Sequence, residues 1–159
     1  MSDLLLRLAT EEDSREISAV LAAAFREFEA LYSAAAFAAT VISPDEVCHR
    51  IREAPLWLAE YDGKIVGTVS ILPQNNELYI RGMAVLPAAR GLKIGLALLQ
   101  QAENFALQNA CKRLFLRTTP YLDKAIRLYE NFGFVRVGAA QEDFFGTPSF
   151  LMEKMLDYR

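Results

Sequence analysis

The residues at positions 90–95 could bind a phosphate group. They read Arg-Gly-Leu-Lys-Ile-Gly and lie between a strand-like run that ends at Leu86 and a long stretch with helical spacing. The first N–H groups of a helix have no partner within the helix and carry a partial positive charge, which suits a phosphate or pyrophosphate. Gly91 and Gly95 would also let a ligand approach the backbone closely. An ordinary loop between a strand and a helix is the alternative interpretation.

The composition argues against several classes of protein. Among 159 residues, 20 acidic side chains outnumber 17 basic ones without any Lys/Arg run, so we expect no nucleic-acid partner. His49 is the single histidine, and Cys48 and Cys111 lack ligand spacing, so we expect no metal site and reduced thiols. No apolar stretch is long enough for a membrane span and no secretory signal is present, so we expect a soluble, cytoplasmic protein.

Turn and capping signals predict the elements that would position the loop. Thr10 and Ser43 are typical of helix starts, and Asp62-Gly63 favours the tight turn of a β-hairpin. Gly82 lies inside the run 77–86, where a glycine often marks a bulge. The expected strands are 4–8, 57–61, 64–72, 77–86, 114–118, 134–137 and 149–156, and further helices are expected up to about Asn109 and over 122–131.

These elements indicate an α/β fold (α+β mixed) in one domain over residues 1–159. We expect a mixed, mostly antiparallel sheet of six to seven strands, flanked by about four helices. The strand at 114–118 should run parallel to the strand at 77–86, because a helix separates the two along the chain.

Three segments resemble motifs of the GNAT superfamily of acyl-CoA-dependent N-acyltransferases. They are Met-Ala-Val-Leu-Pro at 83–87, Arg-Gly-Leu-Lys-Ile-Gly at 90–95 and Ala-Ile-Arg-Leu-Tyr-Glu-Asn-Phe-Gly-Phe at 125–134. The resemblance implies a GNAT-like domain with acetyl-CoA as cosubstrate and no metal. The residues that it implies for coenzyme binding are Met83, Ala84, Val85, Arg90, Gly91, Leu92, Lys93, Ile94, Gly95 and Leu96.

The loop departs from the family pattern at Lys93, which occupies the position of the family's inner glycine. A lysine in an ordinary helical conformation could still donate its backbone N–H, and its ammonium could add a charge-assisted contact to phosphate. Alternatively, its side chain crowds the site and weakens binding. We expect binding to be retained.

The resemblance also gives Gly82 and Val85 a role. A bulge at Gly82 would splay the strand 77–86 away from the strand 114–118, leaving unpaired edges for the pantetheine arm of the coenzyme. The backbone amide near Val85 would then face the acyl carbonyl and stabilise negative charge. If Gly82 only relieves packing, this argument loses its support.

Tyr129 is the residue that the resemblance implies as the acid, protonating the departing thiolate. A phenol has a reference pKa near 10 and a thiol near 8.5, so this proton transfer is modestly uphill. The alternative is a packing tyrosine. The asparagine common in the family seven residues earlier is Leu122 here, so one hydrogen bond that orders the coenzyme is missing.

A base is harder to name. The family position most often used corresponds to Tyr79, which is a poor base at its reference pKa. Glu77 lies two residues earlier on the same strand face, so a water chain past Tyr79 could reach it. A solvated glutamate at a sheet edge is an equally good interpretation of Glu77.

Two segments correspond to the places where the family usually selects its acceptor. Residues 30–42 carry no charge, and residues 141–148 include Glu142 and Asp143. An apolar wall with nearby carboxylates would suit a small amine with a hydrophobic part. A buried helix or a homodimer contact is the alternative for 30–42.

We therefore predict an acyltransferase that moves an acetyl group from acetyl-CoA to a primary amine, of a small molecule or a peptide, by direct transfer in a ternary complex. The alternative is a catalytically impaired CoA-binding or regulatory module of the same fold. A structural domain that binds a partner through residues 30–42 is a third interpretation.

Overall fold

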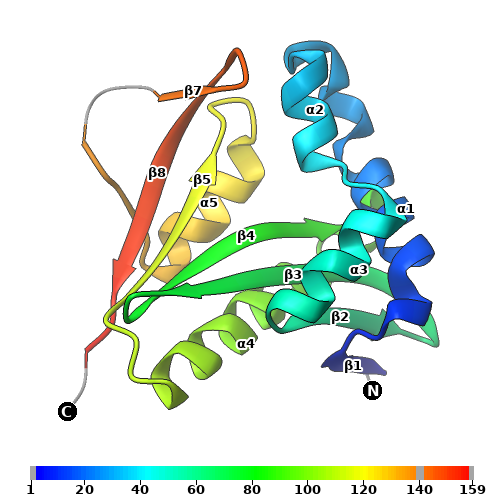
Figure 1. Cartoon of the computed structure of the whole chain (residues 1–159), viewed down its shortest axis with the longest axis horizontal. Coiled ribbons are helices and arrows are strands. Elements are labelled where there is room, and N and C mark those ends of the chain that lie inside the picture. Colours follow the sequence, from blue (N-terminus) through cyan, green and yellow to red (C-terminus); the bar gives the residue numbers. More distant parts are fainter. Residues whose placement is uncertain (1–2, 139–141, 158–159) are drawn as a thin grey trace.

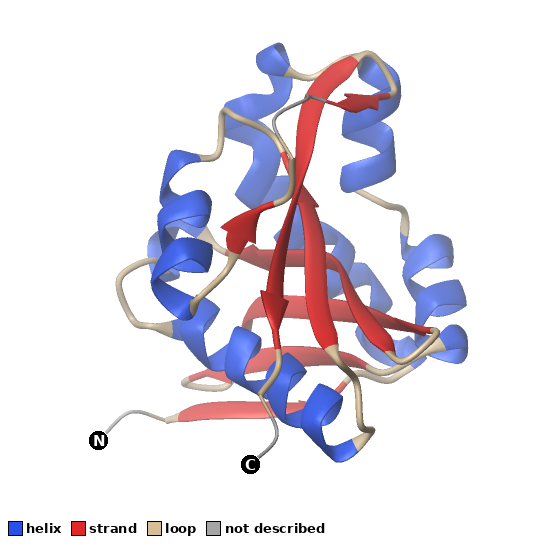
Figure 2. Cartoon of the chain, turned by 90° about the vertical axis from the view of Figure 1, so that its left-hand side faces the viewer, coloured by secondary structure: helices blue, strands red, loops and turns tan. Residues whose placement is uncertain are grey.

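The computed structural model describes residues 3–138 and 142–157, which build a strongly twisted sheet. The strand order is β1-β2-β3-β4-β5-β8-β6, and β7 pairs with β8. Only β4 and β5 pair in parallel among these described strands. In Figures 1 and 2, β1 to β4 run across the molecule, whereas β5 and β8 are turned steeply against them. The strands are β1 (Leu4–Leu8), β2 (Leu56–Tyr61), β3 (Lys64–Gln74), β4 (Glu77–Val85), β5 (Arg113–Thr118), β6 (Val135–Arg136), β7 (Glu142–Phe144) and β8 (Thr147–Met155).

Helices cover both faces of the sheet, and each face has its own apolar core. On one face, Leu98 of α4 joins a cluster that includes Trp57. On the other face, Ile17 of α1 and Val47 of α3 join a cluster that includes Leu58. Trp57 and Leu58 are neighbours on β2, so the alternation of a strand sends them to opposite faces. The helices are α1 (Ser14–Phe25), α2 (Ala34–Thr40), α3 (Pro44–Glu53), α4 (Ile94–Gln108) and α5 (Asp123–Phe132).

The predicted class is confirmed, but the element count differs. The described residues form eight strands and five α-helices, rather than six to seven strands and about four helices. The strand β7 was missed because it has three residues, two of them charged, and exists by pairing with β8. The helix α2 is an alanine-rich segment whose start depends on Ser33, which accepts a hydrogen bond from the N–H of Ala36. The first helix ends at Phe25, and a 3₁₀ segment, η2 (Arg26–Leu31), follows it.

Local signals placed the turns well. Asp62 and Gly63 have φ of 51° and 81°, as a type I′ hairpin turn requires. The next turn is tighter than the gap between the expected strands 64–72 and 77–86. Pro73 and Gln74 still belong to β3, and only Asn75 and Asn76 turn, with φ of 48° and 66°.

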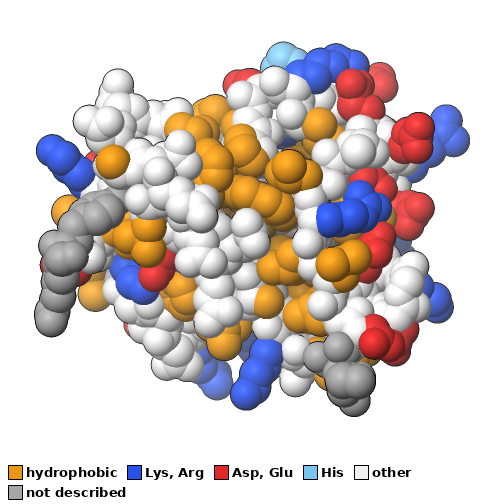
Figure 3. Space-filling model, turned by 90° about the horizontal axis from the view of Figure 1, so that it is seen from below, with side chains coloured by type: hydrophobic (Ala, Val, Ile, Leu, Met, Phe, Trp, Pro, Cys, Tyr) orange, Lys and Arg blue, Asp and Glu red, His pale blue; other side chains and the backbone are white. Residues whose placement is uncertain are grey.

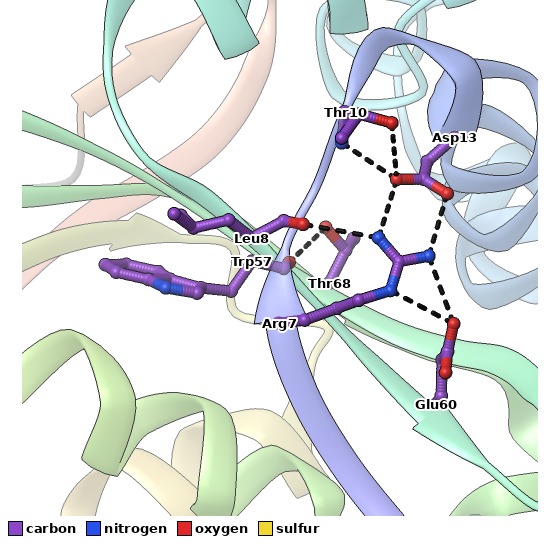
Figure 4. A network of polar contacts seen from close by, with 7 residues as sticks. All are labelled: Arg7, Leu8, Thr10, Asp13, Trp57, Glu60 and Thr68. Atoms are coloured by element: carbon purple, nitrogen blue, oxygen red, sulfur yellow. Dashed lines mark hydrogen bonds and ion pairs between the residues drawn. The ribbon is translucent and has the colours of Figure 1, made fainter.

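The N-terminal end of the sheet holds a hydrogen-bonded ionic network (Figure 4). Arg7 on β1 donates to both carboxylate oxygens of Asp13, each at 2.9 Å, and its Nε donates to Glu60 at 3.1 Å. Asp13 also accepts the N–H of Thr10 at 2.8 Å, which closes the capping box of the 3₁₀ segment η1 (Glu11–Asp13) that leads into α1. Charge pairing and helix capping are thus completed by the same carboxylate.

The surface seen from below is apolar in its middle, with charged side chains toward its edge (Figure 3). Within residues 3–138 and 142–157, no helix has the length and hydrophobicity to cross a membrane.

Candidate active site

The parallel strands β4 and β5 separate half-way along their length. They pair only from Glu77 opposite Arg113 to Ile80 opposite Leu116, although both strands continue beyond. On the other side of β4, Ser70 of β3 lies opposite Gly82 and Ile71 opposite Ile80, so Arg81 is an extra residue. The predicted bulge is therefore present at Arg81-Gly82, and it lies where the two strands part.

The loop after β4 enters α4 through two left-handed residues. Gly91 has φ of 88°, and Lys93 has φ of 62° and ψ of 24°. The expectation of an ordinary helical Lys93 is therefore wrong. Lys93 lies just before the first residue of α4, where the chain turns from its extended path into the helix, and that turn requires a positive φ. Because Ile94, Gly95 and the next residue form the first turn of α4, their N–H groups have no acceptor within the helix.

Gly95 has a packing role that the sequence did not reveal. A Cβ at this position would lie 2.8 Å from Cδ2 of Leu128, so the missing side chain lets α4 approach α5 closely. Leu128 and Gly95 line the same cavity, so the close packing of α4 on α5 shapes one wall of the site.

A large cavity of about 730 Å³ lies beside this loop. Every residue predicted to bind the coenzyme lines it except Leu92, whose side chain is exposed. Arg90 lines it too, and its guanidinium pairs with Glu27 at 2.6 Å and donates to the carbonyl of Ala24 at 3.3 Å. The structure thus gathers the predicted binding residues in one cleft between α4, α5 and the end of α1.

A second, smaller cavity of about 110 Å³ lies where β4 and β5 separate. It meets the larger cavity at four shared lining residues, Phe25, Met83, Leu122 and Tyr129. In Figure 1 this region is enclosed by β5 and α5 on one side and by α1 and α2 on the other. Two cavities that share a wall can hold two reactants side by side.

Tyr129 lies at this junction. Its side chain comes from α5, is buried, and packs against Phe134 with ring centroids 5.9 Å apart. Burial, together with the nearby Tyr32, raises the pKa of Tyr129 to about 12. The phenol therefore keeps its proton throughout the neutral range and can act as a hydrogen-bond donor.

The two predicted acceptor segments come together over the smaller cavity. The N–H of Ser33 donates to Oγ1 of Thr147 at 2.9 Å, and the Ser33 hydroxyl donates to the carbonyl of Phe145 at 2.5 Å. From these segments, Tyr32, Ala39, Thr40, Ile42 and Phe144 line the cavity. Of the segment 141–148, Gln141 lies outside the described residues.

The carboxylates expected beside the amine are directed elsewhere. Glu142 pairs with Arg117 at 2.5 Å, and Asp143 accepts the N–H of Gly146 at 3.2 Å within its own hairpin. Neither residue lines the smaller cavity, whose ionised side chains are Arg50, Arg81 and Arg117. The expected carboxylates therefore do not line the cavity, and each has a partner of its own in the fold.

Sequence reasoning missed Arg50 and Arg81. Arg50 lies three residues after the fully buried Val47 on α3, and Arg81 lies between Ile80 and Gly82 in the interior of β4. A charged side chain on the apolar face of a helix, or within a central strand, was the available signal.

Glu77 is not brought together with Tyr129. It pairs with Arg113 at 2.7 Å, and Arg113 also reaches Glu153 at 2.7 Å. Tyr79, two residues after Glu77, lines the smaller cavity. Its ring stacks on that of Phe115, with the ring centroids 5.0 Å apart. Glu77 lines neither cavity.

No group of three His, Cys, Asp or Glu side chains in the described ranges, 3–138 and 142–157, could hold a metal ion. Cys111 is buried and Cys48 is half-buried, and neither forms a disulfide.

Comparisons with known proteins agree with this geometry. The model of the acetyltransferase (GNAT) family matches residues 17–134. An uncharacterised N-acetyltransferase of Escherichia coli (strain K12), YjgM, is 35% identical over 88 residues, which cover 53% of this chain and 53% of that protein. A probable N-acetyltransferase of Xenopus laevis, camello, is 32% identical over 105 residues, 64% of this chain and 45% of that protein. The chain spans about half the length of these curated relatives.

A solved structure shares the fold. The PaiA N-acetyltransferase from Thermoplasma acidophilum, in complex with coenzyme A, superposes with a TM-score of 0.84 over 97% of this chain and 99% of that chain, at 18% identity. The family model covers most of the chain and the fold agrees, so the chain belongs to the acetyltransferase (GNAT) family, a class of acyltransferases.

Proposed function

We propose that the protein transfers an acetyl group from acetyl-CoA to a primary amine while both are bound. The observation that carries this proposal is the pair of cavities that meet at Tyr129. Coenzyme A is bound in the structural relative from Thermoplasma acidophilum, which supports the choice of carrier.

The larger cavity fits the carrier chemically. The left-handed turn at Gly91 and Lys93 leaves the first N–H groups of α4 free at one end of the cleft, where pyrophosphate oxygens could accept from them. Beyond Ile80, β4 has no strand partner on its β5 side, so its backbone could pair with an extended amide-containing arm. Acetyl-CoA supplies the activated acetyl group.

In this proposal, Tyr129 donates a hydrogen bond to the departing sulfur. Complete proton transfer from a phenol with a pKa of about 12 to a thiolate near 8.5 is uphill by roughly 5 kcal/mol. A strong hydrogen bond to the developing negative charge requires no such transfer and still stabilises the transition state. Tyr129 therefore acts mainly as a donor that remains protonated.

The amine must lose a proton before it attacks. No Asp, Glu or His among the described residues lines the smaller cavity, so water carries this proton. Tyr79 lines the cavity and Glu77 lies two residues before it, so a water chain past Tyr79 to Glu77 is one route to solvent. The substitution Glu77→Gln tests this route, which predicts a lower kcat with little change in KM.

The proposal is tested by titrating acetyl-CoA and CoA calorimetrically and by measuring thiol release with a panel of small primary amines. We expect micromolar binding, the affinity ordinary for such carriers, and amine-dependent thiol release. Binding without turnover by any amine would favour the CoA-binding or regulatory module, for which Leu122 in both cavity walls is the specific observation. Absence of binding would refute the acyl-CoA proposal altogether.

A further inference from the structure

Two arginines in the smaller cavity lack the partners that buried charges require. Arg50 comes from α3 and Arg81 from the bulge in β4, and we call them the arginine pair. Their side chains are 15% and 14% exposed, and both line the cavity. Lys and Arg are almost never buried to this extent without pairing.

The donors of the arginine pair are largely unused. The Nε of Arg50 is buried without a hydrogen bond, and the nearest carboxylate to it, on Glu46, lies 3.9 Å away. The Nη1 of Arg81 donates to Glu53 at 2.8 Å, but its Nε and Nη2 are buried without partners. A buried donor left without an acceptor destabilises the fold, more so when it is charged.

The two positive charges also oppose one another. Burial lowers the pKa of Arg50, and the adjacent Arg81 lowers it further. The third arginine of the cavity, Arg117, is satisfied by Glu142 at 2.5 Å and by the hydroxyl of Ser149 at 3.0 Å. Among the described residues, the arginine pair thus has one carboxylate, Glu53, at hydrogen-bond distance and a second, Glu46, at 3.9 Å. Three buried nitrogens are left over for a further anion.

The missing anion would lie next to the reaction centre. The Nη1 of Arg50 is 3.6 Å from the position that a Cβ on Gly82 would occupy, so its guanidinium lies over the bulge. The same cavity reaches Tyr129 and Met83, where it meets the larger one. Two hydroxyls that line it, those of Ser70 and Thr118, are also buried without a hydrogen bond.

We infer that the acceptor is a small molecule that carries a carboxylate as well as the amine, and that Arg50 and Arg81 bind this carboxylate while the amine faces Tyr129. The guanidinium fork matches a carboxylate in geometry and charge. A cavity of about 110 Å³ holds on the order of ten non-hydrogen atoms, since one water needs roughly 10–15 Å³. An amino acid has this size and carries both groups.

This inference rests on the proposed function only in taking the smaller cavity as the acceptor site. The phosphates of the carrier are not the missing anion, because neither arginine of the pair lines the larger cavity. The alternative of a peptide N-terminus provides no carboxylate next to its amine, and it becomes an outcome of the test.

The test compares matched acceptors that differ only in charge. Amino acids and their carboxamides, for example alanine and alaninamide, or aspartate and its diamide, are assayed for acetyl transfer at saturating acetyl-CoA. Because the carboxamide amines are the more easily deprotonated, kcat/KM is compared at matched concentrations of neutral amine. We expect the carboxylate form to be preferred by at least ~10-fold in the best pair. Equal or better use of the amides, or of peptides, by an active enzyme would overturn the inference.

Variants then connect the preference to the arginine pair. Arg50→Gln and Arg81→Gln should each raise KM for the amino acid about 10-fold or more, leave KM for its amide unchanged and leave the affinity for acetyl-CoA unchanged. Arg52→Gln is the matched control, because Arg52 lies on the same helix, is exposed and pairs with Glu11 outside both cavities. An equal rise in KM for the amino acid in Arg52→Gln would contradict the assignment.

A binding experiment keeps the inference separate from catalysis. N-acetylalanine, N-acetylaspartate and their amides, which require no chemistry, are titrated into the wild-type protein with and without CoA. Tighter binding of a carboxylate than of its amide by ~10-fold would support the inference even if no turnover is found. Indistinguishable binding of carboxylates and amides would refute it, whether or not the protein binds acetyl-CoA.

Discussion

Arginine side chains at the two ends of the sheet differ in how many of their nitrogens donate hydrogen bonds. At the N-terminal end, all three guanidinium nitrogens of Arg7 donate hydrogen bonds, to Asp13 and Glu60, although its side chain is 35% exposed (Figure 4). At the splayed end, Arg50 and Arg81 are more deeply buried but keep three buried nitrogens without partners. The donors of Arg7 are used within the fold, whereas those of Arg50 and Arg81 are available to a ligand in the smaller cavity.

The contrast extends beyond arginine. The splayed end also contains Lys93 in a left-handed conformation and Tyr129 with a raised pKa. The corresponding turn at the other end, Asp62-Gly63, uses residues that tolerate positive φ. Lys93 lines the larger cavity and Tyr129 lies where the two cavities meet, so both features belong to the candidate site. Four predictions test this difference.

The largest expected effect is on catalysis at the splayed end. Tyr129→Phe should lower kcat by ~10²-fold or more, because the donor to the departing sulfur is lost, while the affinity for acetyl-CoA is nearly unchanged. Steady-state thiol release and calorimetry measure the two quantities. Tyr61→Phe in β2, outside both cavities, is the control. Wild-type turnover in Tyr129→Phe would remove Tyr129 from the mechanism.

The second prediction compares the same substitution, arginine to methionine, at the two ends of the sheet. Arg7→Met should lower the free energy of unfolding by about 1–2 kcal/mol, because the largely buried Asp13 loses its paired cation. Arg50→Met should leave it unchanged or raise it, since methionine fills similar space without unsatisfied donors. Urea unfolding at neutral pH compares the two variants. Equal losses in the free energy of unfolding would show that the arginines at both ends stabilise the fold.

The third prediction concerns the left-handed lysine. Lys93→Gly should raise the free energy of unfolding by about 0.5 kcal/mol, because relief of roughly 1–2 kcal/mol of backbone strain exceeds the extra entropy of glycine. The affinity for acetyl-CoA at low salt should fall a few-fold, since the ammonium contact to phosphate is lost. Ala110→Gly is the control: Ala110 has φ of 55° and lines neither cavity. Tighter binding by Lys93→Gly would instead show that the lysine crowds the site.

The smallest effect is a pH dependence at the N-terminal end. The hydrogen bonds from Arg7 lower the pKa of Asp13. A carboxyl group with a lowered pKa in the folded state contributes stability above its unfolded pKa, near 3.9, and loses it as the pH falls through the folded value. The stability difference between wild type and Arg7→Met should therefore narrow below about pH 4. Urea unfolding at pH 6 and pH 3 measures it, and a constant difference would contradict the role of this pair.

Much of the fold was predictable because its signals are local. The hairpin turn at Asp62-Gly63, the cap of α3 by Ser43 and the end of α5 at Gly133 each depend on residues a few positions apart. The loop at the edge of the large cavity was predictable for a related reason, since it is contiguous in sequence with the helix that begins there, but α5 and the end of α1 complete this cavity from distant parts of the chain. The strand β7 was not, because its pairing with β8 and not its own composition holds it in place.

By itself, the sequence determined the order of the elements, the class of the sheet and the bulge near Gly82, because backbone conformation and short-range hydrogen bonds decide each of these. The tertiary structure alone decided which charges remain unpaired. Glu142 and Asp143 are drawn to partners in their own neighbourhood, while Arg50 and Arg81, from different elements, meet in a cavity without enough acceptors. Whether a charge finds a partner depends on distances across the fold, and these exist only once the helices and strands have packed.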